Sequence, residues 1–206
     1  YKPRALAVMH MGAYGAGTGH DEFTKDGEQC HKNAVLYQVT RDERRAELAI
    51  AILDAWATKC TCIDGPNAPL EASWAIGAMA RAAELLKWTY PKWRKDIEAR
   101  FLAWVTKHII PLWAGKCPGT CWDREEKSFN NWQLSICQAR LQLALMRDDL
   151  AGVDWCVSQY KKILANFVMA TGQTGETTRD MTHCQFGLSS LIEIPEMLRH
   201  QGLDLY

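Results

Sequence analysis

The sequence predicts an all-α protein, an incomplete (α/α) toroid or barrel of antiparallel helical hairpins. Apolar residues recur three and four positions apart, as at Ala46, Ile50, Leu53 and Ala57, which is the spacing of one helix face. The helical segments are several turns long and short links join them, which favours antiparallel neighbours. No segment shows the alternation of apolar and polar residues typical of a strand, so we expect no β-sheet.

Cap and turn residues set the expected limits of the helices. Thr40 or Asp42 is expected to cap a helix, Pro91 suits the first turn of another, and Pro195 is expected to kink the last helix before Gly202 ends it. The expected helices are 26–39, one that starts at 40–43 and ends before Cys60, 70–88, 91–110, 129–147, 150–169 and 176–201.

The chain is expected to form a single domain over residues 1–206. A chain of 206 residues can build one large core, whereas two halves would each bury less of their surface. Residues 1–25 form a glycine-rich, irregular N-terminal segment in this interpretation. That segment is not a phosphate loop, because no Gly-Lys-Ser or Gly-Lys-Thr follows its glycines.

The charge balance and the hydropathy of the chain limit the classes of binding partner that we expect. Lys plus Arg number 24 and Asp plus Glu number 24, so the net charge is zero and nothing indicates binding to nucleic acid or to an anionic membrane surface. No apolar stretch is long enough for a membrane span. If the ligand is an anion, a few placed cations must bind it. The oligomeric state stays open.

The eight cysteines show no CxxC zinc spacing, so we expect no metal. Cys117 and Cys121 lie in a loop and can form a bridge, whereas Cys137, Cys156 and Cys184 fall inside helical patterns as small apolar residues. The even count favours an oxidising compartment and a secreted protein, and free thiols throughout are the alternative. No signal peptide is visible, so we expect a processed or trimmed chain.

The nine tryptophans have two interpretations, core filling or stacking on sugar rings. Trp56 and Trp104 stand inside apolar helical patterns and are expected in the core. Trp122 and Trp132 lie near a loop and are the better candidates for a groove. Trp74, on the expected helix 70–88, is a further candidate for substrate binding.

Four ionisable residues share one face of the expected helix 176–201, namely Glu176, Arg179, Asp180 and His183. One interpretation is a solvated face whose ion pairs contribute only about 0.3–0.5 kcal/mol each. The other is a ligand-facing wall, because an Arg, a His and two acids stand together after a glycine-containing turn.

A second polar group begins the expected helix 129–147. Asn130 can be its N-cap with Trp132 in the core. Alternatively, Asn131 and Gln133 donate hydrogen bonds to a ligand carboxylate beside a stacking Trp132. Asn67, in a Gly-Pro-Asn turn, is a weaker candidate because Asn is common in turns.

Several segments together resemble a known family. They are "GPNAPLEASWAIGAMARAAELLK", "NNWQLSICQARLQLALMRDD" and "TGQTGETTRDMTHCQFGLSSLIEIPEMLRHQGLDLY". Their order and spacing resemble the alginate-lyase-like (α/α) domain, especially the polyuronate lyases of polysaccharide lyase family 38, over about residues 20–206. The resemblance implies β-elimination of a 1,4-linked polyuronate, of alginate or glucuronan type, with no cofactor and an anionic polysaccharide as partner.

The resemblance also implies roles for individual residues. Arg179, with Asn131 and Asn67 assisting, neutralises the C6 carboxylate of the substrate, since a guanidinium matches a carboxylate in shape. His183 is the expected base. Gln185 belongs to the same segment and is expected to contact substrate.

The remaining roles are orientation and proton donation. Glu176 or Asp180 is expected to orient the Arg and the His. Related enzymes have a tyrosine where this chain has Phe186, and a histidine where it has Trp132. The proton donor must therefore lie elsewhere, and Tyr14 or His20 is expected to supply it.

Two other functions remain open at this point. One is a catalytically silent polysaccharide-binding or structural protein on the same scaffold. The other is a hydrolase that uses paired carboxylates, although Glu176 and Asp180 are closer in sequence than a flanking pair requires.

Overall fold

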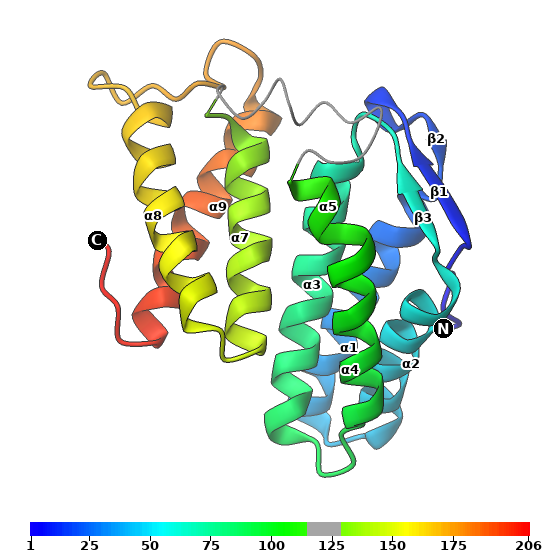
Figure 1. Ribbon diagram of the computed structural model, residues 1–206. Coiled ribbons are helices and arrows are strands. Elements are labelled where there is room, and N and C mark those ends of the chain that lie inside the picture. Colours follow the sequence, from blue (N-terminus) through cyan, green and yellow to red (C-terminus); the bar gives the residue numbers. More distant parts are fainter. Residues whose placement is uncertain (115–128) are drawn as a thin grey trace. The chain divides into compact units, whose positions relative to one another are not determined.

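The computed structural model describes residues 1–114 and 129–206, and it is mostly helical, as the sequence predicts (Figure 1). The expected Cys117–Cys121 bridge and Trp122 lie outside the described residues. The chain divides into two compact units, Tyr1–Trp122 and Asp123–Tyr206. The single domain over 1–206 and the closure into a toroid stay predictions. No helix within the described ranges is long and apolar enough to cross a membrane.

In the first unit α1 lies against both α2 and α3, and α4 lies against α2. The helices are α1 His20–Thr40, α2 Glu43–Lys59, α3 Ala68–Thr89, α4 Lys95–Trp104, a π-helical segment Val105–Ile109 and α5 Ile110–Trp113. Gly27 lets α1 approach α3 closely, because a Cβ there would lie 2.8 Å from the Cα of Ala75.

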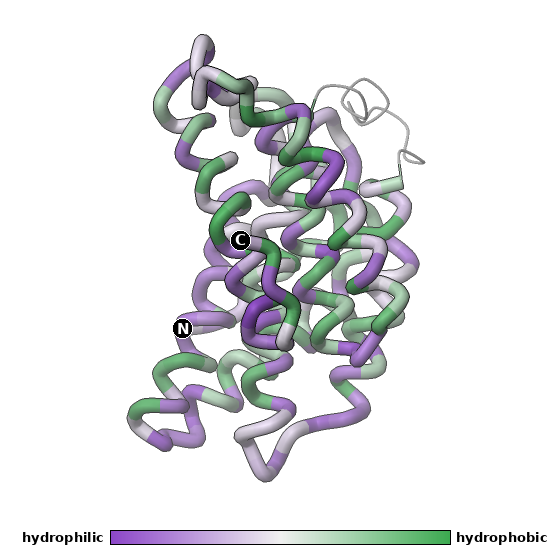
Figure 2. Tube along the Cα trace, turned by 90° about the vertical axis from the view of Figure 1, so that its left-hand side faces the viewer, coloured by the Kyte–Doolittle hydropathy of each residue, from purple (hydrophilic) through white to green (hydrophobic). Residues whose placement is uncertain are grey.

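Green and purple alternate along the tube of Figure 2, so apolar and polar residues recur along the helices.

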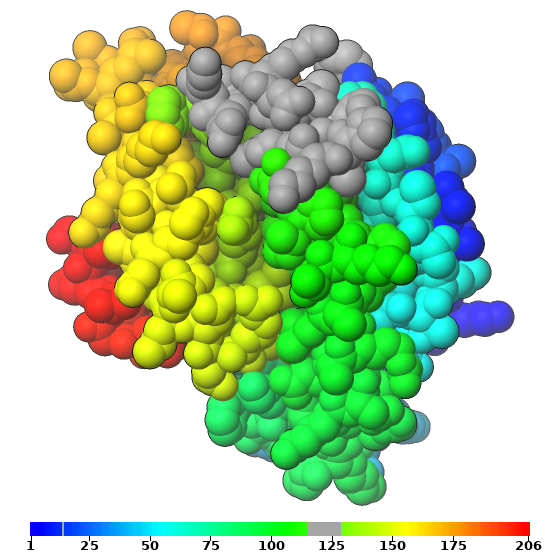
Figure 3. All heavy atoms as spheres, viewed as in Figure 1, coloured from blue at the N-terminus to red at the C-terminus, as the bar shows by residue number. Residues whose placement is uncertain are grey.

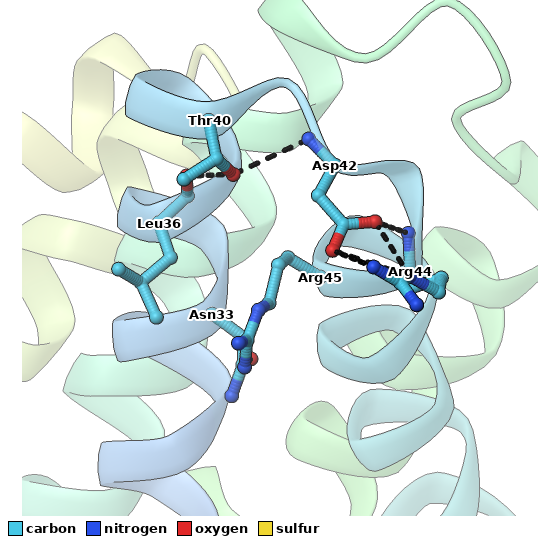
Figure 4. Close-up of polar contacts among 6 residues, drawn as sticks. All are labelled: Asn33, Leu36, Thr40, Asp42, Arg44 and Arg45. Atoms are coloured by element: carbon cyan, nitrogen blue, oxygen red, sulfur yellow. Dashed lines mark hydrogen bonds and ion pairs between the residues drawn. The ribbon is translucent and has the colours of Figure 1, made fainter.

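The start of α2 shows which of the two expected caps is used. Asp42 is the N-cap, and its Oδ1 accepts the backbone N–H of Arg44 at 3.1 Å (Figure 4). Thr40 instead closes α1, where its hydroxyl donates to the carbonyl of Leu36 at 2.8 Å. The expected place of Pro91 in a helix is wrong, because α4 begins only at Lys95 and Pro91 lies in the preceding turn.

A small sheet contradicts the expectation of no strands. Strands β1 Val8–Met11, β2 Gly17–Thr18 and β3 Cys62–Asp64 form a sheet in the order β2-β1-β3, with β1 antiparallel to β2 and parallel to β3. These strands are too short to give a clear alternating pattern. Gly65 explains how the segment after β3 approaches β1: its φ is 103°, and a Cβ would lie 2.4 Å from the carbonyl oxygen of Met11.

The N-terminal segment is also shorter than expected. The first helix begins at His20, inside the range 1–25 that was expected to be irregular. Acidic side chains at Asp21 and Glu22 occupy its first turn, where they interact favourably with the helix dipole.

The second unit consists of α7 Asn131–Met146, α8 Leu150–Phe167 and α9 Met181–His200, with α7 packed against the other two (Figure 1). Asp149 caps α8 by accepting the N–H of Gly152 at 2.9 Å. The core between the helices contains Leu134, Cys137, Leu141, Ala144, Val153, Cys156, Tyr160, Ile163, Phe167, Leu191, Ile194 and Leu198.

The last helix starts later than expected. Glu176 and Arg179 lie in a turn, and α9 begins at Met181 with Asp180 as its N-cap in an extended conformation. Thr174 and Thr177 favour the turn, because the backbone N–H of Thr174 donates to the Thr177 hydroxyl at 2.8 Å. The four ionisable residues therefore do not share one helix face. Pro195 lies within α9, as expected.

The structure confirms the core assignments of Trp56, Trp104, Cys137 and Cys156 but not that of Cys184. Trp56 and Trp104 are buried, and so are the thiols of Cys137 and Cys156. Cys184 is only partly buried. All cysteines within the described ranges are free thiols.

Candidate active site

Glu176 is the buried anchor of the turn before α9. The residue is only 3% exposed, and its Oε1 accepts the backbone N–H of Asn131 at 3.2 Å. Asn131 is the first residue of α7, so the carboxylate lies at a helix N-terminus, where the helix dipole favours negative charge. This bond ties the turn to the start of α7.

Arg179 contacts the carboxylate of Glu176 and is partly exposed to solvent. Its Nη1 is 3.6 Å from Oε2 of Glu176, and 48% of its side chain is exposed. A buried carboxylate thus contacts one side of the guanidinium while the rest faces solvent. The remaining N–H groups can bind a planar anion such as a carboxylate.

Asp180 and His183 form an acid–imidazole pair at the start of α9. Oδ1 of Asp180 accepts the backbone N–H of His183 at 2.9 Å, and Oδ2 lies 2.6 Å from Nδ1 of the same residue. These bonds lower the pKa of Asp180, the backbone bond most strongly. A carboxylate at Nδ1 favours the tautomer with its proton on that nitrogen, so Nε2 keeps a lone pair and can accept a proton.

Phe186 packs beside this pair and not within it. Its ring meets the imidazole of His183 edge to face, with centroids 6.2 Å apart. The side chain carries no group that can move a proton. Gln185, the next residue back, is exposed on α9.

The start of α7 agrees with the interpretation in which Asn130 caps the helix and Trp132 lies in the core. Asn130 is its N-cap, accepting the N–H of Trp132 at 3.0 Å, and Trp132 is only 9% exposed. Little of that ring is therefore open to a sugar. Asn131 and Gln133 are buried as well, and among the described residues the Asn131 amide group has no hydrogen-bond partner. An unpaired buried amide is costly, so a polar group that reached it would be stabilised.

The first unit holds a second acid–imidazole pair. Nδ1 of His20 lies 2.7 Å from Oε2 of Glu71, which is only 2% exposed and belongs to the first turn of α3. The other nitrogen faces the glycine-rich segment, because a Cβ on Gly15 would lie 3.9 Å from Nε2. Tyr14 belongs to the short helix Ala13–Gly15, and its side chain lies outside what the structure describes.

Asn67 and Trp74 also belong to the first unit. Asn67 precedes α3 and donates its backbone N–H to the Met11 carbonyl at 3.0 Å, while its side chain makes no cap bond. Trp74 lies on α3, three residues after Glu71, and is partly buried.

The sequence model of the alginate lyase family matches residues 13–206. The chain belongs to the alginate lyase family. Membership implies a lyase that acts on a polysaccharide. No curated protein matches the chain.

The match to the alginate lyase family contains every candidate residue, from Tyr14 to Gln185. In the second unit the structure brings together Asn131, Glu176 and Arg179, and it pairs Asp180 with His183. In the first unit it pairs His20 with a residue that the sequence analysis did not single out. No group of three metal-ligating side chains converges among the described residues.

Glu71 is the residue that sequence reasoning missed. A signal was present, since it is the one charged residue in the segment from Ala68 to Ile76, which apart from Ser73 is otherwise apolar. Its partner is distant in sequence, so the pairing became visible only when α1 and α3 came together. A buried carboxylate is rarely found without such a partner.

Proposed function

We propose that the protein cleaves a 1,4-linked polyuronate, of alginate or glucuronan type, by β-elimination, as in the polysaccharide lyases of family 38. The Asp180–His183 pair next to Arg179 in the chain carries this proposal, because it supplies a candidate base and a candidate carboxylate binder in neighbouring positions. The family match supports the reaction class.

The first step is neutralisation of the substrate carboxylate. Arg179 binds the C6 carboxylate through N–H groups that Glu176 does not occupy. Charge neutralisation makes the C5 proton more acidic and stabilises the enolate-like charge that develops on its removal.

The second step is proton removal and bond cleavage. Nε2 of His183 takes the C5 proton, and Asp180 stabilises the imidazolium that results. The electron pair released at C5 forms the C4–C5 double bond, and the C4–O4 bond breaks. The departing O4 receives a proton, for which Tyr14 and His20 stay the predicted donors.

Incubation with alginate, glucuronan and a neutral polysaccharide tests this function. We expect ultraviolet absorbance from unsaturated uronate ends with at least one polyuronate and none with the neutral polymer. New reducing ends without that absorbance would indicate a hydrolase. No product with any polyuronate would refute the lyase.

The silent binding protein is the second candidate, and Phe186 favours it, because no proton donor stands at that position. Affinity electrophoresis in gels that contain each polymer distinguishes it from the lyase. Retarded migration without product would establish binding alone.

We also propose that the protein works outside the cell, where a polysaccharide substrate is accessible. Immunodetection in culture supernatant and in cell lysate tests this, and detection in the lysate alone would contradict it.

A further inference from the structure

An arginine and a tryptophan stack between two helices of the second unit. Arg140 lies on α7 and Trp155 on α8, and the guanidinium carbon is 3.6 Å from the centroid of the indole. That separation is a close cation–π contact. Atoms of α8 form much of the visible surface of the second unit in Figure 3.

The charge of Arg140 is not neutralised by any carboxylate within residues 1–114 and 129–206. The side chain is partly buried, and this burial lowers the pKa of Arg140. Arg147, the C-cap of the same helix, shows the contrasting case, since it pairs with Asp149. A cation that is removed from water without a counter-charge is costly, so an anion at Arg140 would be stabilised.

Beyond the cation–π contact of Arg140 with Trp155, polar and cationic side chains continue along α8. Ser158, Gln159 and Lys162 follow Trp155 at spacings of three, four and seven residues, which place them on the same side of the helix. Lys162 lies 5.7 Å from the ring centroid of Phe129, just before α7. Seven residues of helix span about 10 Å, longer than one pyranose ring.

Acidic groups are nearly absent from this surface. Helix α7 contains no Asp or Glu, and α8 contains only Asp154. Asp154 precedes Trp155 and so points about 100° away around the helix. We call Arg140, Trp155, Gln159 and Lys162 the α7–α8 strip.

We propose that the α7–α8 strip binds uronate units of the polysaccharide at a distance from the reacting bond. Arg140 pairs with a uronate carboxylate, and Lys162 with another further along. Trp155, which is 38% exposed, offers apolar ring surface to a sugar, and Gln159 can hydrogen-bond its hydroxyls. The identity of the ligand rests on the proposed function, and the charge and stacking come from the strip itself.

The test compares Arg140→Met with Lys161→Met. Methionine keeps much of the arginine stem and removes its charge. Lys161 is exposed on α8 next to the strip, so its substitution makes the same change of charge outside it. We expect Arg140→Met to raise KM for long polyuronate about tenfold, more than it changes kcat, because one charge-assisted contact is lost. Lys161→Met should change KM less than about twofold.

Affinity electrophoresis in polyuronate gels gives a readout that does not need turnover. Less retardation of Arg140→Met than of Lys161→Met, with equal unfolding temperatures, supports the strip. Equal KM and equal retardation of the two variants would overturn the strip while the lyase stands. A wild-type protein that neither cleaves nor binds any polyuronate overturns the proposed function, and the ligand of the strip with it.

Discussion

Asp180 uses one oxygen to cap α9 and the other to hold His183. Oδ1 accepts the backbone N–H of His183 at 2.9 Å, and Oδ2 lies 2.6 Å from its Nδ1. The same side chain therefore fixes where the helix begins and which imidazole nitrogen faces away. Helix stability and imidazole orientation depend on a single carboxylate, and suitable substitutions separate them.

Asp180→Asn should separate these two roles. Asn is as good an N-cap as Asp, so the unfolding temperature should stay near that of the wild type. The amide cannot stabilise an imidazolium as a carboxylate does, so turnover should fall about 100-fold. Asp180→Ala should lose turnover and also lower the unfolding temperature by a few degrees. Turnover of Asp180→Asn equal to wild type would exclude the proposed pair.

Arg179→Ala should reduce turnover by about 100-fold or more while the fold stays intact, because the group that neutralises the substrate carboxylate is removed. Arg199→Ala is the matched control, since Arg199 is exposed on α9 and pairs with Glu196 as Arg179 does with Glu176. Steady-state kinetics on polyuronate and circular dichroism measure the two effects. Equal activity of both variants would refute the role of Arg179.

Glu71→Gln and His20→Asn should not act additively. If Glu71 acts through His20, each substitution lowers turnover about tenfold or more, and Glu71→Gln adds nothing in a protein that already lacks His20. The exposed pair of His10 and Asp64, with 2.6 Å between Nδ1 and Oδ1, is the control in the same unit. Replacing it should leave turnover unchanged. Additive losses at positions 20 and 71 would show that the residues act independently.

Gly27→Ala should destabilise the first unit. Alanine favours a helix over glycine by about 1 kcal/mol, but here its Cβ would lie 2.8 Å from the backbone of α3. Overpacking of this kind costs about 1–3 kcal/mol and should prevail. Glu28→Ala, at the exposed neighbouring position, should change the free energy of unfolding by less than about 0.5 kcal/mol. A more stable Gly27→Ala protein in urea unfolding would contradict the close helix contact.

Acid should remove part of the stability that Asp149 supplies. The N–H of Gly152, and then the side chain of Arg147, lower the pKa of Asp149 below its value in the unfolded chain, which is about 3.9. A lowered folded-state pKa stabilises the protein above the unfolded pKa, and this contribution is lost as the pH falls through the folded pKa. Asp149→Asn keeps an N-cap without the charge. Urea midpoints of the two proteins should differ most above about pH 5 and converge in stronger acid.

The helices were predictable because periodicity and caps are local signals. Asp42 caps a helix and Pro195 lies within one, as the sequence predicts. The start of α9 was not predictable, because the helical pattern of the sequence extends back through Glu176 as readily as it begins at Met181. The turn is chosen by threonine hydroxyls, which act locally, and by a carboxylate buried against α7, which is a tertiary effect.

The family resemblance named His183 and Arg179, and their roles in catalysis stay predictions. The local geometry was not predictable, because Asp180 holds His183 as the N-cap of α9 and not from within a longer helix. The burial of Trp132 and the pairing of His20 with Glu71 depend on packing between segments far apart in the chain. No local pattern reports such packing.

The bond from Asn131 to Glu176 has a dynamic consequence. A motion that carries the whole turn, with Glu176 and Arg179, away from α7 must break this bond and uncover a backbone amide at the start of α7. The turn and the first residues of that helix therefore form one local unfolding unit. Loosening of the turn that carries Arg179 is therefore coupled to loosening of the helix start that lies behind it.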